Sequence, residues 1–140
     1  MIVPGYFLSE KYDEEEFLQR IEDALKGGVD ILQLREKEKT DFEILNLGKK
    51  VKKICDEYKI PLLIDDKPHL AWALGCGVHV GADDFPISLC RKLLGEKALI
   101  GATAKSVEAA KKAQEEGANY LGVGAIFETK THVKTKRTSV

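Results

Sequence analysis

The chain has 140 residues, of which 44% are hydrophobic and 32% charged, and its net charge at pH 7 is -1. Length and composition predict one folded domain spanning 1–140, and the balanced charge disfavours a general nucleic-acid binder. No apolar run reaches the roughly 18 residues of a membrane span. The N-terminus does not resemble a signal peptide, so we expect a cytoplasmic protein. Three cysteines without metal-type spacing are expected to be buried or idle thiols.

Short β-rich runs alternate with amphipathic segments along the chain. The runs predict strands over 2–8, 29–35, 60–65, 76–81, 97–103 and 119–127. Helical periodicity, with start and stop signals, predicts helices over 13–28, 40–59, 68–75, 86–95 and 106–118. Such alternation indicates an α/β protein with a parallel sheet, either open and doubly wound or part of a (β/α)8 barrel.

Polar side chains gather where the predicted strands end, which is the edge where parallel α/β proteins bind ligands. Arg35 and Lys37 suit a phosphate or diphosphate, and Asp66 and Asp84 suit a hard cation such as Mg²⁺. The full set comprises Gln33, Arg35, Lys37, Asp65, Asp66, Asp83, Asp84, Thr103, Lys105, Thr129, Lys130 and Thr131.

Each of these signals also has a structural interpretation. The acidic pairs 65–66 and 83–84 precede predicted helices and could cap them, and the charged run 35–38 could be a solvated turn with mutual ion pairs. His79 lies in an apolar strand, which favours a core histidine with a satisfied ring over a ligand or a base. Trp72 is expected to pack among apolar neighbours on its helix.

Several motifs, in order, resemble the thiamine-phosphate synthase family. They read QLREKE, LLIDDKPHLAWALGCGVHVGADDFP, RKLLGEKALIGATAKS and EGANYLGVGAIFETKT. The resemblance implies a TIM-type (β/α)8 barrel, of which this chain covers about the first six units. It also implies a Mg²⁺-dependent transferase that joins hydroxymethylpyrimidine diphosphate to hydroxyethylthiazole phosphate. The products are thiamine phosphate and diphosphate, and loss of the carbon–oxygen bond runs ahead of attack.

The resemblance also implies roles for individual residues. The expected partners are small-molecule substrates, and neither a nucleic acid nor a membrane is expected as a partner. By position, Arg35, Lys37 and Thr103 are expected to be catalytic and Asp66 and Asp84 to bind Mg²⁺. The positions expected to bind substrate are Gln33, Arg35, Lys37, Asp65, Thr103, Thr129, Thr131 and His132.

Some positions depart from the family pattern. Asp65 stands where the family usually has asparagine, and ionised Asp repels a diphosphate to which Asn can donate a hydrogen bond. His132 ends a motif that usually continues with lysine. Strands seven and eight are expected to be missing, which leaves room for a completing partner or a homo-oligomer.

The sequence is also compatible with two other functions. A related thiazole tautomerase shares the turn at Phe127, although the histidine that it can carry is Ala125 here. The second of these functions is that of a non-catalytic remnant that binds a phosphorylated ligand.

Overall fold

The computed structural model describes residues 2–4 and 13–123 of the chain. Within these residues, six strands form one parallel sheet whose order follows the chain from β1 to β6. The strands are β1 (Ile2–Pro4), β2 (Leu32–Arg35), β3 (Leu62–Asp65), β4 (Gly77–Val80), β5 (Ile100–Ala104) and β6 (Tyr120–Val123). The helices are α2 (Glu14–Lys26), α3 (Asp41–Glu57), α4 (Pro68–Leu74), α5 (Ile87–Leu94) and α6 (Val107–Glu115). The predicted alternation is confirmed, with strands shorter than expected.

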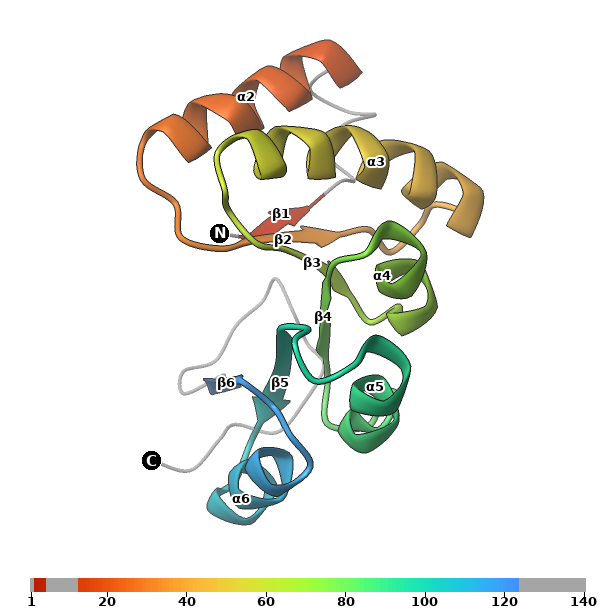
Figure 1. Cartoon of the computed structure of the whole chain (residues 1–140), viewed down its shortest axis with the longest axis vertical. Coiled ribbons are helices and arrows are strands. Elements are labelled where there is room, and N and C mark those ends of the chain that lie inside the picture. Colours follow the sequence, from red (N-terminus) through yellow and green to blue (C-terminus); the bar gives the residue numbers. More distant parts are fainter. Residues whose placement is uncertain (1, 5–12, 124–140) are drawn as a thin grey trace.

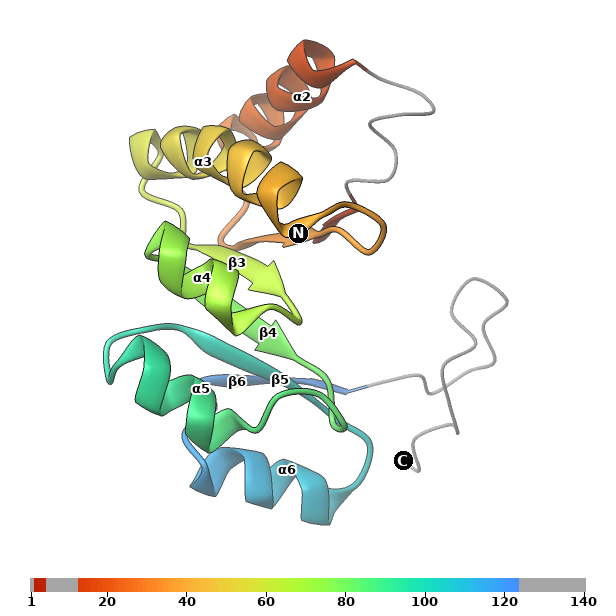
Figure 2. The ribbon, with the colours of Figure 1, turned by 90° about the vertical axis from the view of Figure 1, so that its right-hand side faces the viewer.

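The helices lie outside the strands. In Figure 1 they form an outer arc from α2 and α3 through α4 and α5 to α6, and the strands lie inside this arc. Figure 2 shows α3, α4 and α5 stacked on the same side of the sheet. A doubly wound sheet carries helices on both faces and reverses its strand order, whereas a barrel wall has sequential strands and helices on one face. The structure therefore favours the barrel-type arrangement, and β1 does not pair with β6 in the described residues.

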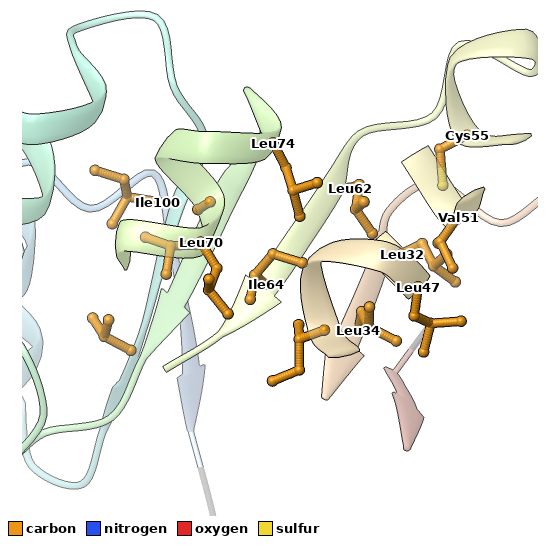
Figure 3. Close-up of a cluster of buried hydrophobic side chains, with 14 of the residues drawn as sticks. Leu32, Leu34, Leu47, Val51, Cys55, Leu62, Ile64, Leu70, Leu74 and Ile100 are labelled. Atoms are coloured by element: carbon orange, nitrogen blue, oxygen red, sulfur yellow. The ribbon is translucent and has the colours of Figure 1, made fainter. Parts of the chain in front are cut away.

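The hydrophobic core fills the space between the sheet and the helices (Figure 3). Alternate strand residues point toward the helices. Leu32, Leu34, Ile64, Val78 and Ile100 are each at most 1% exposed, and they pack in one cluster with residues of α3 and α4. Since these positions face the helices, their strand neighbours face the inner side of the sheet, which the described helices leave uncovered.

Local side-chain caps explain where several helices begin. Asp13 accepts a hydrogen bond from the Glu16 amide at 2.8 Å at the start of α2. At α3 Thr40 and Glu43 form a reciprocal capping box, which satisfies amides that the helix itself leaves unpaired. The longest described helix, α3, has 17 residues, and none of the described helices has the length and apolar character needed to cross a membrane.

Two sequence-based interpretations need correction here. The acidic pairs do not cap the following helices, because α4 begins after Lys67 and α5 after Pro86, and neither helix has a side-chain cap. Trp72 is 63% exposed, so the prediction that it packs in the core is wrong. Its helix is only 7 residues long and turns Leu70, Ala71 and Leu74 inward, which leaves Trp72 on the outer surface.

The cysteines behave as expected from their spacing. All three are free, and Cys55 and Cys90 are buried. Burial raises the pKa of the Cys55 and Cys90 thiols to about 11 and that of Cys76 to about 12. Because the thiolate is the reactive form, a raised pKa keeps these thiols mainly in the less reactive protonated form at neutral pH.

Candidate functional site

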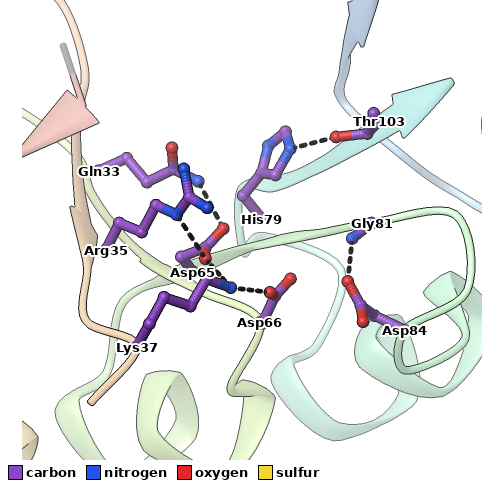
Figure 4. A network of polar contacts seen from close by, with 9 residues as sticks. All are labelled: Gln33, Arg35, Lys37, Asp65, Asp66, His79, Gly81, Asp84 and Thr103. Atoms are coloured by element: carbon purple, nitrogen blue, oxygen red, sulfur yellow. Dashed lines mark hydrogen bonds and ion pairs between the residues drawn. The ribbon is translucent and has the colours of Figure 1, made fainter. Parts of the chain in front are cut away.

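The candidate site lies on the inner face of the sheet, toward the carboxyl ends of its strands. Gln33 and Arg35 on β2, Asp65 on β3, His79 on β4 and Thr103 on β5 alternate with the core residues described above. Asp65 pairs with His79 in the parallel register, so the two side chains lie side by side on adjacent strands. Figure 4 shows how the polar side chains of β2 reach across toward β3. The sheet therefore brings together residues that are far apart in the sequence.

Asp65 is the centre of the polar network on this face. Its Oδ1 accepts a hydrogen bond from Gln33 Nε2 at 3.3 Å. Its Oδ2 lies 2.7 Å from Lys37 Nζ and 3.7 Å from Arg35 Nε (Figure 4). Burial lowers the pKa of Lys37, but the hydrogen bonds to Asp65 and Asp66 and the charges of these carboxylates together outweigh burial, so the pKa is raised. Both cations expected to bind an anion thus already have a carboxylate partner within the protein.

Asp66 has an unusual backbone conformation that allows its carboxylate to join the same network. Its φ is 59°, in the left-handed region that few residues other than glycine adopt. Two successive residues of a regular strand would point to opposite faces, but this conformation breaks the alternation after Asp65. As a result Lys37 Nζ contacts both carboxylates. Left-handed non-glycine residues tend to be found at functional sites, and here the conformation directly serves the clustering of charge.

Asp84 lies in the turn that follows β4. Its Oδ2 accepts a hydrogen bond from the Gly81 amide at 2.8 Å, and its own amide donates to the Gly81 carbonyl at 3.3 Å. A Cβ on residue 81 would overlap this carboxylate in its present position, so glycine there allows its close approach to the amide. The turn holds Asp84 at the same edge of the sheet as Asp66 (Figure 4).

The acidic groups at this edge suit Mg²⁺ in type, although the described residues contain no cluster of three or more His, Cys, Asp or Glu that could hold a metal ion. Mg²⁺ commonly uses one or two protein carboxylates and completes its shell with water and substrate phosphates. Asp66 follows β3 and Asp84 follows β4, so each of these successive loops offers one carboxylate at this edge. Lys37 contacts Asp66 Oδ2, so a cation at Asp66 would compete with that ammonium group.

The loop after β2 is not the solvated turn that its charges suggested. Arg35 and Lys37 pair with Asp65 of the next β/α unit. Glu36, which lies between them in the sequence, is buried, with only 4% of its surface exposed. Burial raises the pKa of Glu36, while Lys39 Nζ, 3.5 Å away, opposes that rise. Glu36 turns toward the protein interior, which leaves Arg35 and Lys37 on the inner face. Glu36 forms a local ion pair with Lys39, which lies just outside the run 35–38 for which mutual pairing was predicted.

His79 has both ring nitrogens hydrogen bonded, which confirms the prediction of a satisfied ring. Its Nε2 lies 2.9 Å from Thr103 Oγ1, and its Nδ1 lies 2.9 Å from the Tyr120 hydroxyl. Burial lowers the pKa of His79, although Asp65, Asp66 and Asp84 act in the opposite direction. Its contact with Thr103 ties it to a predicted site residue, and sequence reasoning missed this link. The alternation of Val78, His79 and Val80 was the available signal, since it places the histidine opposite the core-facing valines.

The structure places most, but not all, of the predicted site residues. Gln33, Arg35, Lys37, Asp65 and Asp66 form one contiguous network. Thr103 bonds to His79, and Asp84 bonds to Gly81. Thr129, Lys130, Thr131 and His132 lie outside the described residues.

Fold and site together define an α/β protein of the TIM-barrel type whose strand ends carry paired cations and carboxylates. A family model described as thiamine monophosphate synthase matches residues 6–140. The chain belongs to this family. It is 46% identical over 129 residues to the thiamine-phosphate synthase of Methanobrevibacter smithii, covering 91% of this chain and 61% of that protein. It is 51% identical over 119 residues to the thiamine-phosphate synthase of Campylobacter jejuni, covering 84% and 56%.

A solved structure supports the fold assignment independently. The thiamine phosphate pyrophosphorylase from Pyrococcus furiosus superimposes with a TM-score of 0.76 at 29% sequence identity. The match covers 90% of this chain and 59% of that chain. The chain thus spans about three fifths of the length of these relatives.

Proposed function

We propose that this chain binds hydroxymethylpyrimidine diphosphate at the carboxyl edge of the sheet. The whole-protein reaction that we propose transfers the hydroxymethylpyrimidine group to hydroxyethylthiazole phosphate, giving thiamine phosphate and diphosphate. The observation that carries the proposal is the convergence of Arg35 and Lys37 on one point of the inner face, beside Asp65 and Asp66. Membership of the thiamine monophosphate synthase family supplies the substrate class.

In this proposal the side chains on β2 bind the leaving group. Arg35 offers a planar fork of donors and Lys37 a mobile point charge, and both favour an anion whose charge grows as the carbon–oxygen bond breaks. Gln33, which lies two residues before Arg35 on the same face of β2, contacts the pyrimidine. The Thr103 hydroxyl contacts the diphosphate.

Asp66 and Asp84 would hold Mg²⁺ in the same proposal. When bound, the ion neutralises charge on the departing diphosphate and helps to orient it. Lys37 then has two roles, because it neutralises the carboxylates when no ligand is present and pairs with diphosphate oxygens when the ligand is bound. Thr129 and Thr131 are proposed to contact the thiazole phosphate, and His132 the diphosphate.

Titration of the chain with hydroxymethylpyrimidine diphosphate, with and without Mg²⁺, tests the proposal by calorimetry. We expect binding that strengthens when Mg²⁺ is present. Asp84→Asn keeps an oxygen for the Gly81 amide but loses the charge, so it should bind the ligand with little Mg²⁺ dependence. Absence of binding to a folded wild-type sample would contradict the proposal, and a full Mg²⁺ response in Asp84→Asn would remove that residue from the metal site.

Neutralising Asp65 is expected to tighten ligand binding. Asp65→Asn should raise the affinity for inorganic diphosphate about tenfold, because one opposing charge is removed and an amide donor replaces it. Calorimetric titration measures the change. Asp23→Asn removes the same charge from an exposed site on α2 and should leave binding unchanged. Weaker binding in Asp65→Asn would show that the carboxylate mainly holds Arg35 and Lys37 in position.

A further inference from the structure

Three hydrogen-bonded side chains cross the inner face of the sheet from β6 to β4 and back to β5. The Tyr120 hydroxyl lies 2.9 Å from His79 Nδ1, and His79 Nε2 lies 2.9 Å from Thr103 Oγ1. The Tyr120 and His79 rings are tilted by 36°, with their centroids 5.6 Å apart. All three side chains are partly buried. Figure 4 shows the His79 end of this chain of contacts, directed toward Thr103 and away from the network around Asp65.

Gly101 makes this contact possible. In the parallel register, Gly101 on β5 pairs with His79 on one side and with Tyr120 on the other. A Cβ at residue 101 would overlap the Tyr120 ring, so the absence of a side chain lets that ring lie across β5 toward β4. Thr103 follows two residues later and therefore points to the same face. The contacts of Tyr120, His79 and Thr103 therefore depend on glycine at position 101.

The number of available protons restricts how the three groups share hydrogen bonds. Burial lowers the pKa of His79 and so favours the neutral ring, which has one donor nitrogen and one acceptor nitrogen. The charged groups that act on this ring are the carboxylates of Asp65, Asp66 and Asp84, and each of them opposes that shift.

Two directions of donation satisfy these contacts. Tyr120 can donate to Nδ1 while Nε2–H donates to Thr103, or both bonds can run the other way. A phenol is more acidic than an aliphatic alcohol and is the stronger donor, so the first direction is favoured even though burial raises the pKa of Tyr120. In that direction Thr103 accepts from His79, and its own hydroxyl hydrogen is left to donate elsewhere.

We propose that His79 and Tyr120 are positioning residues that hold the Thr103 hydroxyl as a hydrogen-bond donor toward an anionic oxygen of the ligand. This inference rests on the proposed function, since it takes the diphosphate as the anion that Thr103 contacts. It assigns to this Tyr120–His79–Thr103 relay the orientation of one donor: because His79 bonds to the hydroxyl oxygen, Thr103 keeps its hydroxyl hydrogen for a ligand oxygen that accepts hydrogen bonds.

Replacement of Tyr120 by phenylalanine tests the relay in the full 140-residue chain, with inorganic diphosphate and Mg²⁺ as the probe. Tyr120→Phe keeps the ring but removes the hydroxyl, and we expect diphosphate affinity measured by calorimetry to fall about tenfold. Tyr58→Phe is the matched control, because it also loses one phenol hydrogen bond, to Glu22, on another part of the protein. Its affinity should equal that of the wild type.

The imidazole tautomer provides the readout that a merely structural role would not move. Nitrogen NMR of wild-type His79 should show the proton on Nε2, and Tyr120→Phe should shift the population toward Nδ1–H. Thr103→Val should abolish the effect of Tyr120→Phe on affinity, because the relay then has no donor to direct.

Three results would each overturn the relay. They are an unchanged affinity in Tyr120→Phe, a weakened affinity with an unchanged tautomer, and an Nδ1–H tautomer in the wild type. If the wild-type chain fails to bind diphosphate, the proposed function fails, while the tautomer of the ligand-free protein still decides the direction of donation.

Discussion

Replacing Arg35 with alanine is expected to weaken binding of hydroxymethylpyrimidine diphosphate about a hundredfold. A charge-assisted hydrogen bond in a partly buried site is worth about 1.5–3 kcal/mol, and Arg35 is placed to form more than one with a diphosphate. The Arg35 side chain is only 21% exposed, so water replaces it poorly. The loss also leaves Asp65 with one cation fewer, which increases its repulsion of the ligand. Calorimetric titration of the variant measures the change directly.

Two further variants show whether the effect comes from the site. Arg20→Ala removes the same charge from the exposed surface of α2 and should change affinity by less than about twofold. Arg35→Lys keeps the charge but loses the fork, so an intermediate affinity is expected. The role assigned to Arg35 would be withdrawn if Arg35→Ala bound the ligand as tightly as Arg20→Ala does.

Replacing Arg91 with alanine is expected to lower the free energy of unfolding by about 3 kcal/mol, because several carbonyl groups lose a charged donor at once. Arg91 Nη1 donates to the carbonyls of Gly95 and Ala98 at 2.9 and 2.7 Å. Its Nη2 donates to the Gly117 carbonyl at 2.6 Å and to Asn119 Oδ1 at 2.7 Å. This single guanidinium group connects the loops that lead into β5 and β6.

Urea unfolding measures the effect of Arg91→Ala, and Lys92→Ala is the matched control. Lys92 is the exposed neighbour on the same helix, so its loss should cost less than about 0.5 kcal/mol. Arg91→Lys retains the charge but cannot reach four acceptors, so it should resemble the alanine variant. Equal stability of Arg91→Ala and Lys92→Ala would show that the two loops hold their positions without the guanidinium group.

These two substitutions are expected to separate ligand binding from folding. Arg35 lies at the carboxyl ends of the strands, whereas the contacts of Arg91 precede β5 and β6 and so belong to the amino ends. In barrel-type proteins the carboxyl ends carry the active site and the amino ends serve stability. Arg35→Ala should therefore unfold at nearly the wild-type urea concentration.

The sequence predicted the helices and strands well, because their signals are local. The capping box of Thr40 and Glu43 involves residues three positions apart and forms as the pattern indicates. The period of two in β2 likewise puts Gln33 and Arg35 on one face, and both side chains contact Asp65 there. The resemblance to a family, carried by ordered motifs, is also a property of sequence alone and is confirmed.

Contacts between distant residues could not be predicted in the same way. Asp65 is joined to Gln33 across 32 positions and His79 to Tyr120 across 41, and no local pattern encodes either pair. The left-handed backbone at Asp66 depends on packing around β3 and β4, where its amide bonds to the His79 carbonyl at 2.8 Å. The helix-capping interpretation of Asp65 and Asp66 failed for this reason, since their carboxylates pair with side chains of β2 and the loop after it. Asp84 instead bonds to the Gly81 amide within its own turn.

By itself, then, the sequence determined the order of elements, the face on which each strand residue lies and the family of the protein. Periodicity and capping act over a few residues, so they can be read along the chain. The tertiary structure decided which charges neutralise one another, which tyrosine reaches His79 and why Trp72 remains exposed. Those outcomes depend on how neighbouring strands are registered and how helices cover them, and burial and pairing are fixed only when the sheet is assembled.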